Sequence, residues 1–113
     1  MIFKKTVAFA IASLCPMFSW ADQCASWGCT STIEQLYTNA NGLIYVSTPL
    51  DETKANCTVY AGSYFVLNPA AKNFSEVYSS LLAAYMSDSK IQLRIKEGSA
   101  NCELSYVRLN KNF

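Results

Sequence analysis

The sequence predicts a small α+β domain, mainly β, in which five strands form an OB-fold-like antiparallel barrel with one helix inserted before the last hairpin. Two observations carry this prediction. Several short runs are rich in β-branched and aromatic residues and are separated by Gly-containing turns. One segment, residues 74–86, has apolar residues at helical spacing. The predicted order is β-β-β-α-β-β, and closure into a barrel would remove the exposed edges of so small a sheet.

Three strands are predicted before the helix. Residues 32–37 and 43–47 flank a loop that contains Asn41-Gly42, which supplies the positive φ that a hairpin loop needs. Residues 58–67 are rich in Tyr, Val and Phe and predict the third strand, with a bulge or bend at Gly62.

The helix has both a start signal and an apolar stripe. Asn73 is a favourable N-cap, and Glu76 stands where a capping box places its acidic residue. The stripe consists of Phe74, Val77, Tyr78, Leu81, Leu82 and Tyr85. Small residues occupy the other side and could face solvent or a neighbouring subunit: Ser75, Ser79, Ser80 and Ala83.

The sequence predicts that the last two strands pair as a hairpin. Residues 91–96 alternate apolar and polar side chains, which indicates a half-buried strand. Residues 97–101 contain a glycine and turn the chain into the final strand, residues 102–109.

The N-terminus predicts a secretory signal peptide over residues 1–21, with two lysines, an apolar run and small residues at Ser19 and Ala21. The apolar run is too short to span a bilayer comfortably. Residues 22–113 then form a single OB-like binding domain that is secreted or periplasmic, with no membrane span. A lipoprotein signal ending at Cys15 is the alternative, although a leucine precedes it where a lipobox needs a small residue.

The exported segment contains four cysteines, an even number that predicts two disulfides. Three pairings are possible, and we prefer Cys24–Cys29 with Cys57–Cys102. The longer bridge would close a loop of about 45 residues and stabilise the fold by roughly 3 to 4 kcal/mol. Paired cysteine knuckles and histidines are lacking, so we expect no metal site.

Composition disfavours catalysis and polyanion binding. The sequence contains no histidine, so it lacks the usual general base, and we expect no catalytic residues and no cofactor. Asp51 and Glu52 are expected to be solvated surface residues and not a catalytic carboxylate pair. Without Lys4 and Lys5, seven basic residues face eight acidic ones, a net charge of −1, and the cations are scattered. We therefore expect no nucleic-acid binding.

Two segments carry a resemblance to a known family. Residues 74–85, followed by residues 90–95, resemble the helix-then-strand segment of the binding (B) subunits of AB5 toxins, most closely the subtilase cytotoxin type and its small secreted relatives. The similarity extends weakly to residues 33–38 and 42–46. The resemblance implies an OB-fold protein that forms a homo-oligomer, often a pentamer, binds host glycans or glycoproteins and has a toxin A subunit as partner.

The resemblance also points to the N-terminal cysteine pair. In the binding component of subtilase cytotoxin, one serine at the start of the first strand is central to sialoglycan binding, and Cys29 aligns with it here. Ser26, Thr30 and Ser31 are the nearest hydroxyls. The candidate ligand-binding residues are Trp27, Thr30 and Ser31. A short disulfide loop could hold the Trp27 ring at the surface for stacking on a sugar; alternatively, the ring caps one mouth of the barrel.

The sequence therefore supports two hypotheses. The first is a secreted, non-enzymatic binding subunit that recognises a glycan or glycoprotein. The alternative is a periplasmic inhibitor or immunity-type protein that binds a partner enzyme, because small disulfide-linked domains with exposed loop aromatics also suit that role. Four tyrosines are interpreted as core or cross-strand packing residues and not as ligand contacts: Tyr37, Tyr45, Tyr60 and Tyr106.

Overall fold

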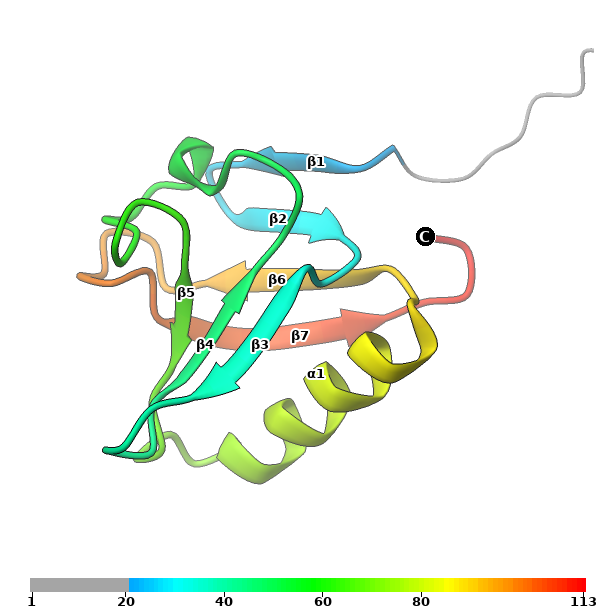
Figure 1. Cartoon of the computed structure of the whole chain (residues 1–113). Helices are drawn as coiled ribbons and strands as arrows, with labels where there is room; N and C mark the ends of the chain where they lie inside the picture. Colours follow the sequence, from blue (N-terminus) through cyan, green and yellow to red (C-terminus); the bar gives the residue numbers. More distant parts are fainter. Residues whose placement is uncertain (1–20) are drawn as a thin grey trace, which may run out of the picture.

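The computed structural model describes residues 21–113, which form two antiparallel sheets and a long helix (Figure 1). Sheet A has the strand order β1-β2-β6-β7 and sheet B has the order β3-β4-β5. The elements are β1 (Gln23–Ala25), β2 (Gly28–Ser31), β3 (Gln35–Thr38), β4 (Ile44–Ser47), the 3-10 turn η1 (Glu52–Lys54), β5 (Phe65–Leu67), α1 (Phe74–Ser87), β6 (Ile91–Ile95) and β7 (Leu104–Leu109).

The predicted class, α+β with mainly β, is confirmed, and the predicted order β-β-β-α-β-β recurs as β3-β4-β5-α1-β6-β7. The five-stranded barrel is not found in residues 21–113, because the two sheets do not close on each other. They meet at one corner, where Val66 of β5 forms an isolated bridge with Glu103, the residue before β7. The helix packs against β7 of one sheet and β3 of the other (Figure 1).

The predicted signal peptide lies outside the described residues, apart from Ala21, as does Cys15. Among the residues described, no helix has the length and apolar character needed to cross a membrane.

Two strands are additional to the prediction. β1 and β2 form a hairpin whose turn is Ser26-Trp27, and β2 lies between β1 and β6, which buries all four of its residues. The close pairing depends on Gly28, which has φ +137° and stands opposite Arg94. A Cβ at this position would overlap the backbone carbonyl of Leu93.

The third predicted strand is shorter than expected, because only residues 65–67 form β5. Ala61 and Gly62 have φ of +52° and +81°, and this left-handed pair turns the chain back on itself. Tyr60 and Tyr64 then face each other as an isolated antiparallel bridge. The bend predicted at Gly62 is therefore a full reversal.

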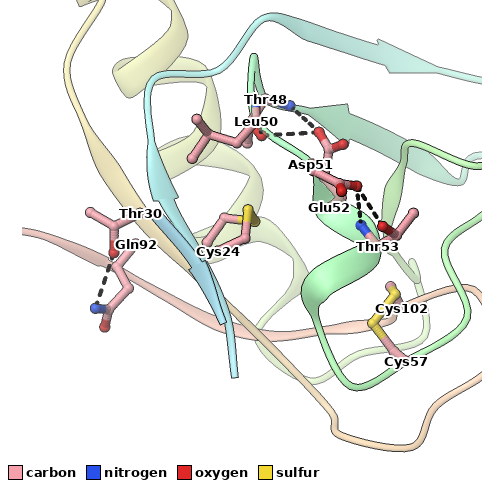
Figure 2. The surroundings of a disulfide bond; sticks show 11 residues. Cys24, Thr30, Thr48, Leu50, Asp51, Glu52, Thr53, Cys57, Gln92 and Cys102 are labelled. Carbon is pink, nitrogen blue, oxygen red and sulfur yellow. Dashed lines mark hydrogen bonds between the residues drawn. A yellow bond between two sulfur atoms is a disulfide. The ribbon is translucent and has the colours of Figure 1, made fainter. Parts of the chain in front are cut away.

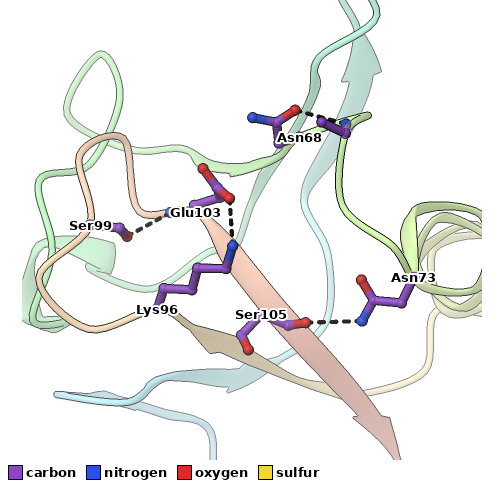
Figure 3. A network of polar contacts seen from close by, with 7 residues as sticks. Asn68, Asn73, Lys96, Ser99, Glu103 and Ser105 are labelled. Carbon is purple, nitrogen blue, oxygen red and sulfur yellow. Dashed lines mark hydrogen bonds and ion pairs between the residues drawn. The ribbon is translucent and has the colours of Figure 1, made fainter.

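The helix begins as predicted and ends one residue later. Its predicted capping box is wrong: the Asn73 side chain makes no cap bond and instead donates from Nδ2 to the Ser105 carbonyl, 3.0 Å away, which ties the helix start to β7 (Figure 3). Val77 and Leu81 of the predicted stripe are buried, but Leu82 and Tyr85 are 41% and 43% exposed. Part of the apolar side of α1 therefore extends beyond its contacts with β7 and β3 and is exposed to solvent.

Both predicted disulfides are present, and their cysteines pack in or against a single core (Figure 2). Cys24 and Cys29 stand directly opposite each other in the β1–β2 hairpin, with 4.0 Å between their Cα atoms. Cys57 and Cys102 join the loop before β5 to the turn before β7, with a Cα separation of 4.9 Å.

The expectation that both acidic residues near η1 are solvated is wrong for one of them. Asp51 is exposed and caps η1, with its Oδ1 accepting from Thr53. Glu52 is only 3% exposed, and its Oε2 accepts from the Thr48 N–H at 2.6 Å and the Thr48 hydroxyl at 3.0 Å (Figure 2). The buried carboxylate is therefore occupied in holding the loop after β4.

Candidate functional site

The candidate ligand-binding residues of the N-terminal hairpin do not share one surface. Thr30 is 2% exposed, and its Oγ1 accepts from Gln92 Nε2 at 3.3 Å (Figure 2). Ser31 is fully buried. Both side chains are therefore covered by neighbouring residues in the folded chain. We therefore revise the candidate set and retain only Trp27.

Trp27 lies in the β1–β2 turn, half-buried and held from both sides by backbone bonds. The N–H of Asn56 donates to the Ser26 carbonyl at 2.9 Å, and the N–H of Ile95 donates to the Trp27 carbonyl at 3.0 Å. The indole ring lies beside the Arg94 guanidinium, whose central carbon is 4.9 Å from the ring centroid. The ring is fixed on the edge of sheet A.

A group of four aromatic rings lies on sheet B, and sequence reasoning did not identify it as a site. Ile44 and Val46 of β4 join the core, so alternation places Tyr45 on the outer face. Tyr37 of β3 stands directly opposite Tyr45. The turn between Tyr60 and Tyr64 adds two further rings. We call Tyr37, Tyr45, Tyr60 and Tyr64 the tyrosine cluster.

The four rings of the tyrosine cluster are joined through Tyr45, which contacts each of the other three. Tyr45 is central and 5% exposed, with ring centroids 4.9 Å from Tyr37, 4.9 Å from Tyr60 and 5.9 Å from Tyr64. Tyr37 and Tyr64 meet edge to face at 5.7 Å. The outer members Tyr37 and Tyr60 are 38% and 40% exposed. The interpretation as packing residues therefore fits Tyr45, whereas Tyr37 and Tyr60 also offer an accessible surface.

Two amide side chains border the tyrosine cluster. Asn39 Nδ2 donates to the Tyr45 hydroxyl at 3.1 Å, and the Tyr64 hydroxyl donates to Gln35 Oε1 at 3.0 Å. Each amide keeps further donor or acceptor capacity. Rigid aromatic rings with hydroxyl and amide groups at their margin can stack on an apolar ligand face and hydrogen-bond its polar groups.

Ionisation within the tyrosine cluster is disfavoured. Burial raises the pKa of Tyr37, and the neighbouring Tyr64 and Tyr60 raise it further. Burial likewise raises the pKa of Tyr45, with Tyr60 adding to the shift and the hydrogen bond from Asn39 opposing it. Tyr37 and Tyr45 therefore stay uncharged at neutral pH.

We expect an alkaline titration to reveal two tyrosines that ionise above the ordinary tyrosine pKa of about 10. Their pKa is higher in the folded than in the unfolded chain, so the stability they contribute is present below about pH 10 and is lost as the pH rises through the folded pKa. The absorbance of tyrosinate, followed against pH in folded and in urea-unfolded protein, measures the difference in tyrosine pKa between the two states. Identical titration curves for the two states would contradict it.

A cavity of about 310 Å³ lies elsewhere, between the end of α1 and the end of β7. Its lining residues are Ala83, Ala84, Ser87, Ser89, Lys90, Leu109, Asn110 and Lys111. The lining is mainly apolar with two lysines, of which Lys90 pairs with Asp22 at 2.8 Å. Within residues 21–113 no group of three or more histidine, cysteine, aspartate or glutamate side chains is arranged to hold a metal ion.

Comparison of the chain with protein-family models, with curated proteins and with solved structures finds no match.

Proposed function

We propose that this protein is a secreted, non-enzymatic binding subunit of the AB5 toxin B type, and that it recognises host glycans or glycoproteins through the tyrosine cluster. The observation that carries the proposal is the packing of four tyrosine rings against a rim of amides on the outer face of sheet B. Two disulfides are typical of exported domains and support the secreted location.

The family assignment rests on the resemblance of residues 74–85 and 90–95 and on the element order. The series β3-β4-β5-α1-β6-β7 has the order expected of an OB-type domain with a helix before its last hairpin. We propose that the two sheets are an opened OB barrel, joined at the Val66–Glu103 bridge. The β1–β2 hairpin then extends sheet A beyond the five barrel strands.

A neutral sugar fits the tyrosine cluster better than a charged ligand does. The exposed rings of Tyr37 and Tyr60 provide apolar faces, and the Asn39 and Gln35 amides can exchange hydrogen bonds with hydroxyl groups. Rigid tyrosines lose little conformational entropy when they bind.

We expect the purified protein to bind a defined set of glycans on an array, and Tyr60→Ala to weaken that binding by about tenfold or more, as truncation of a contact worth about 1.4 kcal/mol does. Leu109→Ala is the control, because Leu109 on β7 is a large apolar residue that is 53% exposed and lies outside the tyrosine cluster. The proposal fails if no glycan binds on an array that detects a known AB5 binding pentamer, or if both variants bind equally.

A homo-oligomer, most simply a pentamer, completes the proposal, and α1 supplies a surface for it. Leu82, Tyr85 and Met86 are 41%, 43% and 74% exposed, which is unusual for large apolar side chains so close together. The predicted contact face was made of small residues around Ser79. We propose instead that these apolar side chains carry the contact between copies.

We expect light scattering of the protein to give a mass several times that of one chain, and Met86→Glu to shift the protein to monomer, because the variant places a charge in an apolar contact. Asn112→Glu, at an exposed position near the C-terminus, is the control and should leave the mass unchanged. A monomeric wild-type protein at micromolar concentration would contradict the ring and favour the alternative, a periplasmic inhibitor or immunity-type protein. An adjacent gene for a toxin A subunit supports the binding-subunit proposal, and an adjacent gene for an effector or hydrolase supports the inhibitor or immunity-type alternative.

A further inference from the structure

Both arginines of the sequence lie on the outer face of sheet A. Ile91, Leu93 and Ile95 of β6 point into the core, so alternation directs Gln92 and Arg94 outward. The strand register then defines two rows across this face. One row contains Thr30, Gln92 and Arg108, of which Thr30 and Gln92 are buried, and the next contains Gly28, Arg94 and Tyr106.

Arg94 is flanked by two aromatic rings from the neighbouring strands. Its guanidinium carbon is 4.9 Å from the Trp27 ring centroid on the β2 side and 5.7 Å from the Tyr106 ring centroid on the β7 side. Both distances are within the range of cation–π attraction. Gly28, opposite Arg94 on β2, contributes no side chain to this row. The guanidinium therefore lies between an aromatic ring on the β2 side and another on the β7 side.

The hydrogen-bonding edge of Arg94 is not used within residues 21–113. No described carboxylate pairs with it, and no hydrogen bond from its guanidinium to another described residue is present. Arg108, one row away, differs because its Nη1 donates to Gln92 Oε1 at 3.1 Å. Lys96 is likewise paired, with Glu103 at 2.8 Å (Figure 3). A guanidinium carries five N–H donors, so Arg94 presents a full set at the surface.

We propose that Arg94 is the centre of a second binding site, which takes a carboxylate group of the ligand. The planar guanidinium edge matches a carboxylate in a bidentate arrangement, and the charge assistance makes such hydrogen bonds stronger than neutral ones. The Trp27 and Tyr106 rings flank the position and offer apolar surface to the part of the ligand next to the carboxylate. This site lies on sheet A, whereas the tyrosine cluster lies on sheet B, so the site goes beyond the proposed glycan function.

The site is pre-organised by the structure around Trp27. Backbone bonds from Asn56 and Ile95 hold the turn, and the Cys24–Cys29 disulfide lies across the same hairpin. An arginine side chain normally loses rotamer freedom when it captures an anion. Since the two rings already hold Arg94, a carboxylate encounters a donor set that needs little further ordering.

Nuclear magnetic resonance titrations test the site with small probes in matched pairs. The sugar pair is methyl glucuronide and the uncharged methyl glucoside; the peptide pair is N-acetylglycine and its amide. Once the signal peptide predicted over residues 1–21 is removed, Trp27 is the one remaining tryptophan, so its indole N–H signal is unambiguous. We expect the two acids to shift this signal saturably and their neutral partners not to do so. The acid that binds more tightly identifies the source of the carboxylate.

Two variants separate a bidentate site from general charge attraction. Arg94→Lys keeps the charge but loses the planar guanidinium that can donate two parallel hydrogen bonds to a carboxylate. We expect this variant to weaken binding of the acids by about tenfold or more. Arg108→Lys, the other arginine of the same face, should change binding by less than about twofold, because its charge is retained and it lies outside the Trp27–Arg94–Tyr106 row. Unchanged amide signals of β2 and β7 verify that both variants are folded.

Equal shifts with acid and neutral probes, or full affinity in Arg94→Lys, would overturn the proposal. Tyr60→Ala should leave acid binding intact, so failure of this site and failure of the tyrosine cluster are distinguishable.

Discussion

Replacing Gly28 with alanine is expected to destabilise the fold by at least about 3 kcal/mol, through two additive causes. Gly28 has φ +137°, a backbone region that is strained for a residue with a side chain. The new Cβ would also overlap the Leu93 carbonyl, so β2 and β6 would have to separate. Because β2 is central in sheet A, this separation would also remove the contact between Trp27 and Arg94.

Gly98→Ala is the matched control for this prediction. Gly98 also has a positive φ, +82°, but a methyl group added there would have no atom within 4 Å. We expect this variant to lose about 1 kcal/mol, the cost of a left-handed backbone alone. Denaturant unfolding measures both variants. Equal losses would show that the close approach of β2 to β6 contributes nothing.

The elements that sequence reasoning predicts correctly are those with a pattern inside one segment. α1 has six apolar residues at helical spacing, and β6 alternates over its full length, so each carries its own signal. The β3–β4 hairpin is marked by Gly42, which has the expected positive φ of +85°. The two disulfides follow from an even cysteine count and a preference for one of three pairings.

The β1–β2 hairpin is absent from the prediction because its two strands carry no such pattern. Their sequences, Gln-Cys-Ala and Gly-Cys-Thr-Ser, are short and rich in small or polar residues, so strand propensity is weak. They are strands because β6 offers an edge and a disulfide joins them. Thr30 and Ser31 are predicted as ligand contacts because they are hydroxyls next to Cys29, the position to which the resemblance points, and both are buried.

Neither candidate site can be assembled from sequence spacing. The tyrosine cluster combines the β3–β4 hairpin, in which Tyr37 stands opposite Tyr45, with a chain reversal that brings Tyr60 and Tyr64 onto the same face. Trp27 is predicted as a candidate ligand contact, but its neighbour Arg94 depends on the register between β2 and β6. Register between distant strands is a tertiary property, which local periodicity does not encode.

Removing the Cys57–Cys102 bridge, by paired Cys57→Ala and Cys102→Ala, is expected to cost about 3 to 4 kcal/mol, because the bridge closes a loop with a sequence separation of 45. Domains of this size are stable by only about 5 to 15 kcal/mol, so the variant should be close to unfolding at physiological temperature. Alanine is chosen because Cys102 is fully buried and a serine hydroxyl there would add a desolvation cost.

The short bridge provides the comparison that tests the cause. Cys24→Ala with Cys29→Ala opens a loop with a sequence separation of only 5, for which the chain-entropy model gives about 2 kcal/mol. Denaturant unfolding should therefore rank the long-bridge variant as the less stable, after peptide mapping without reduction has verified both bridges in the parent. The reverse ranking would contradict the entropic account. It would indicate that the short bridge contributes more to stability than loop length predicts. The short bridge lies in the hairpin whose turn places Trp27 beside Arg94, and the bond from the Asn56 N–H to the Ser26 carbonyl also holds that turn.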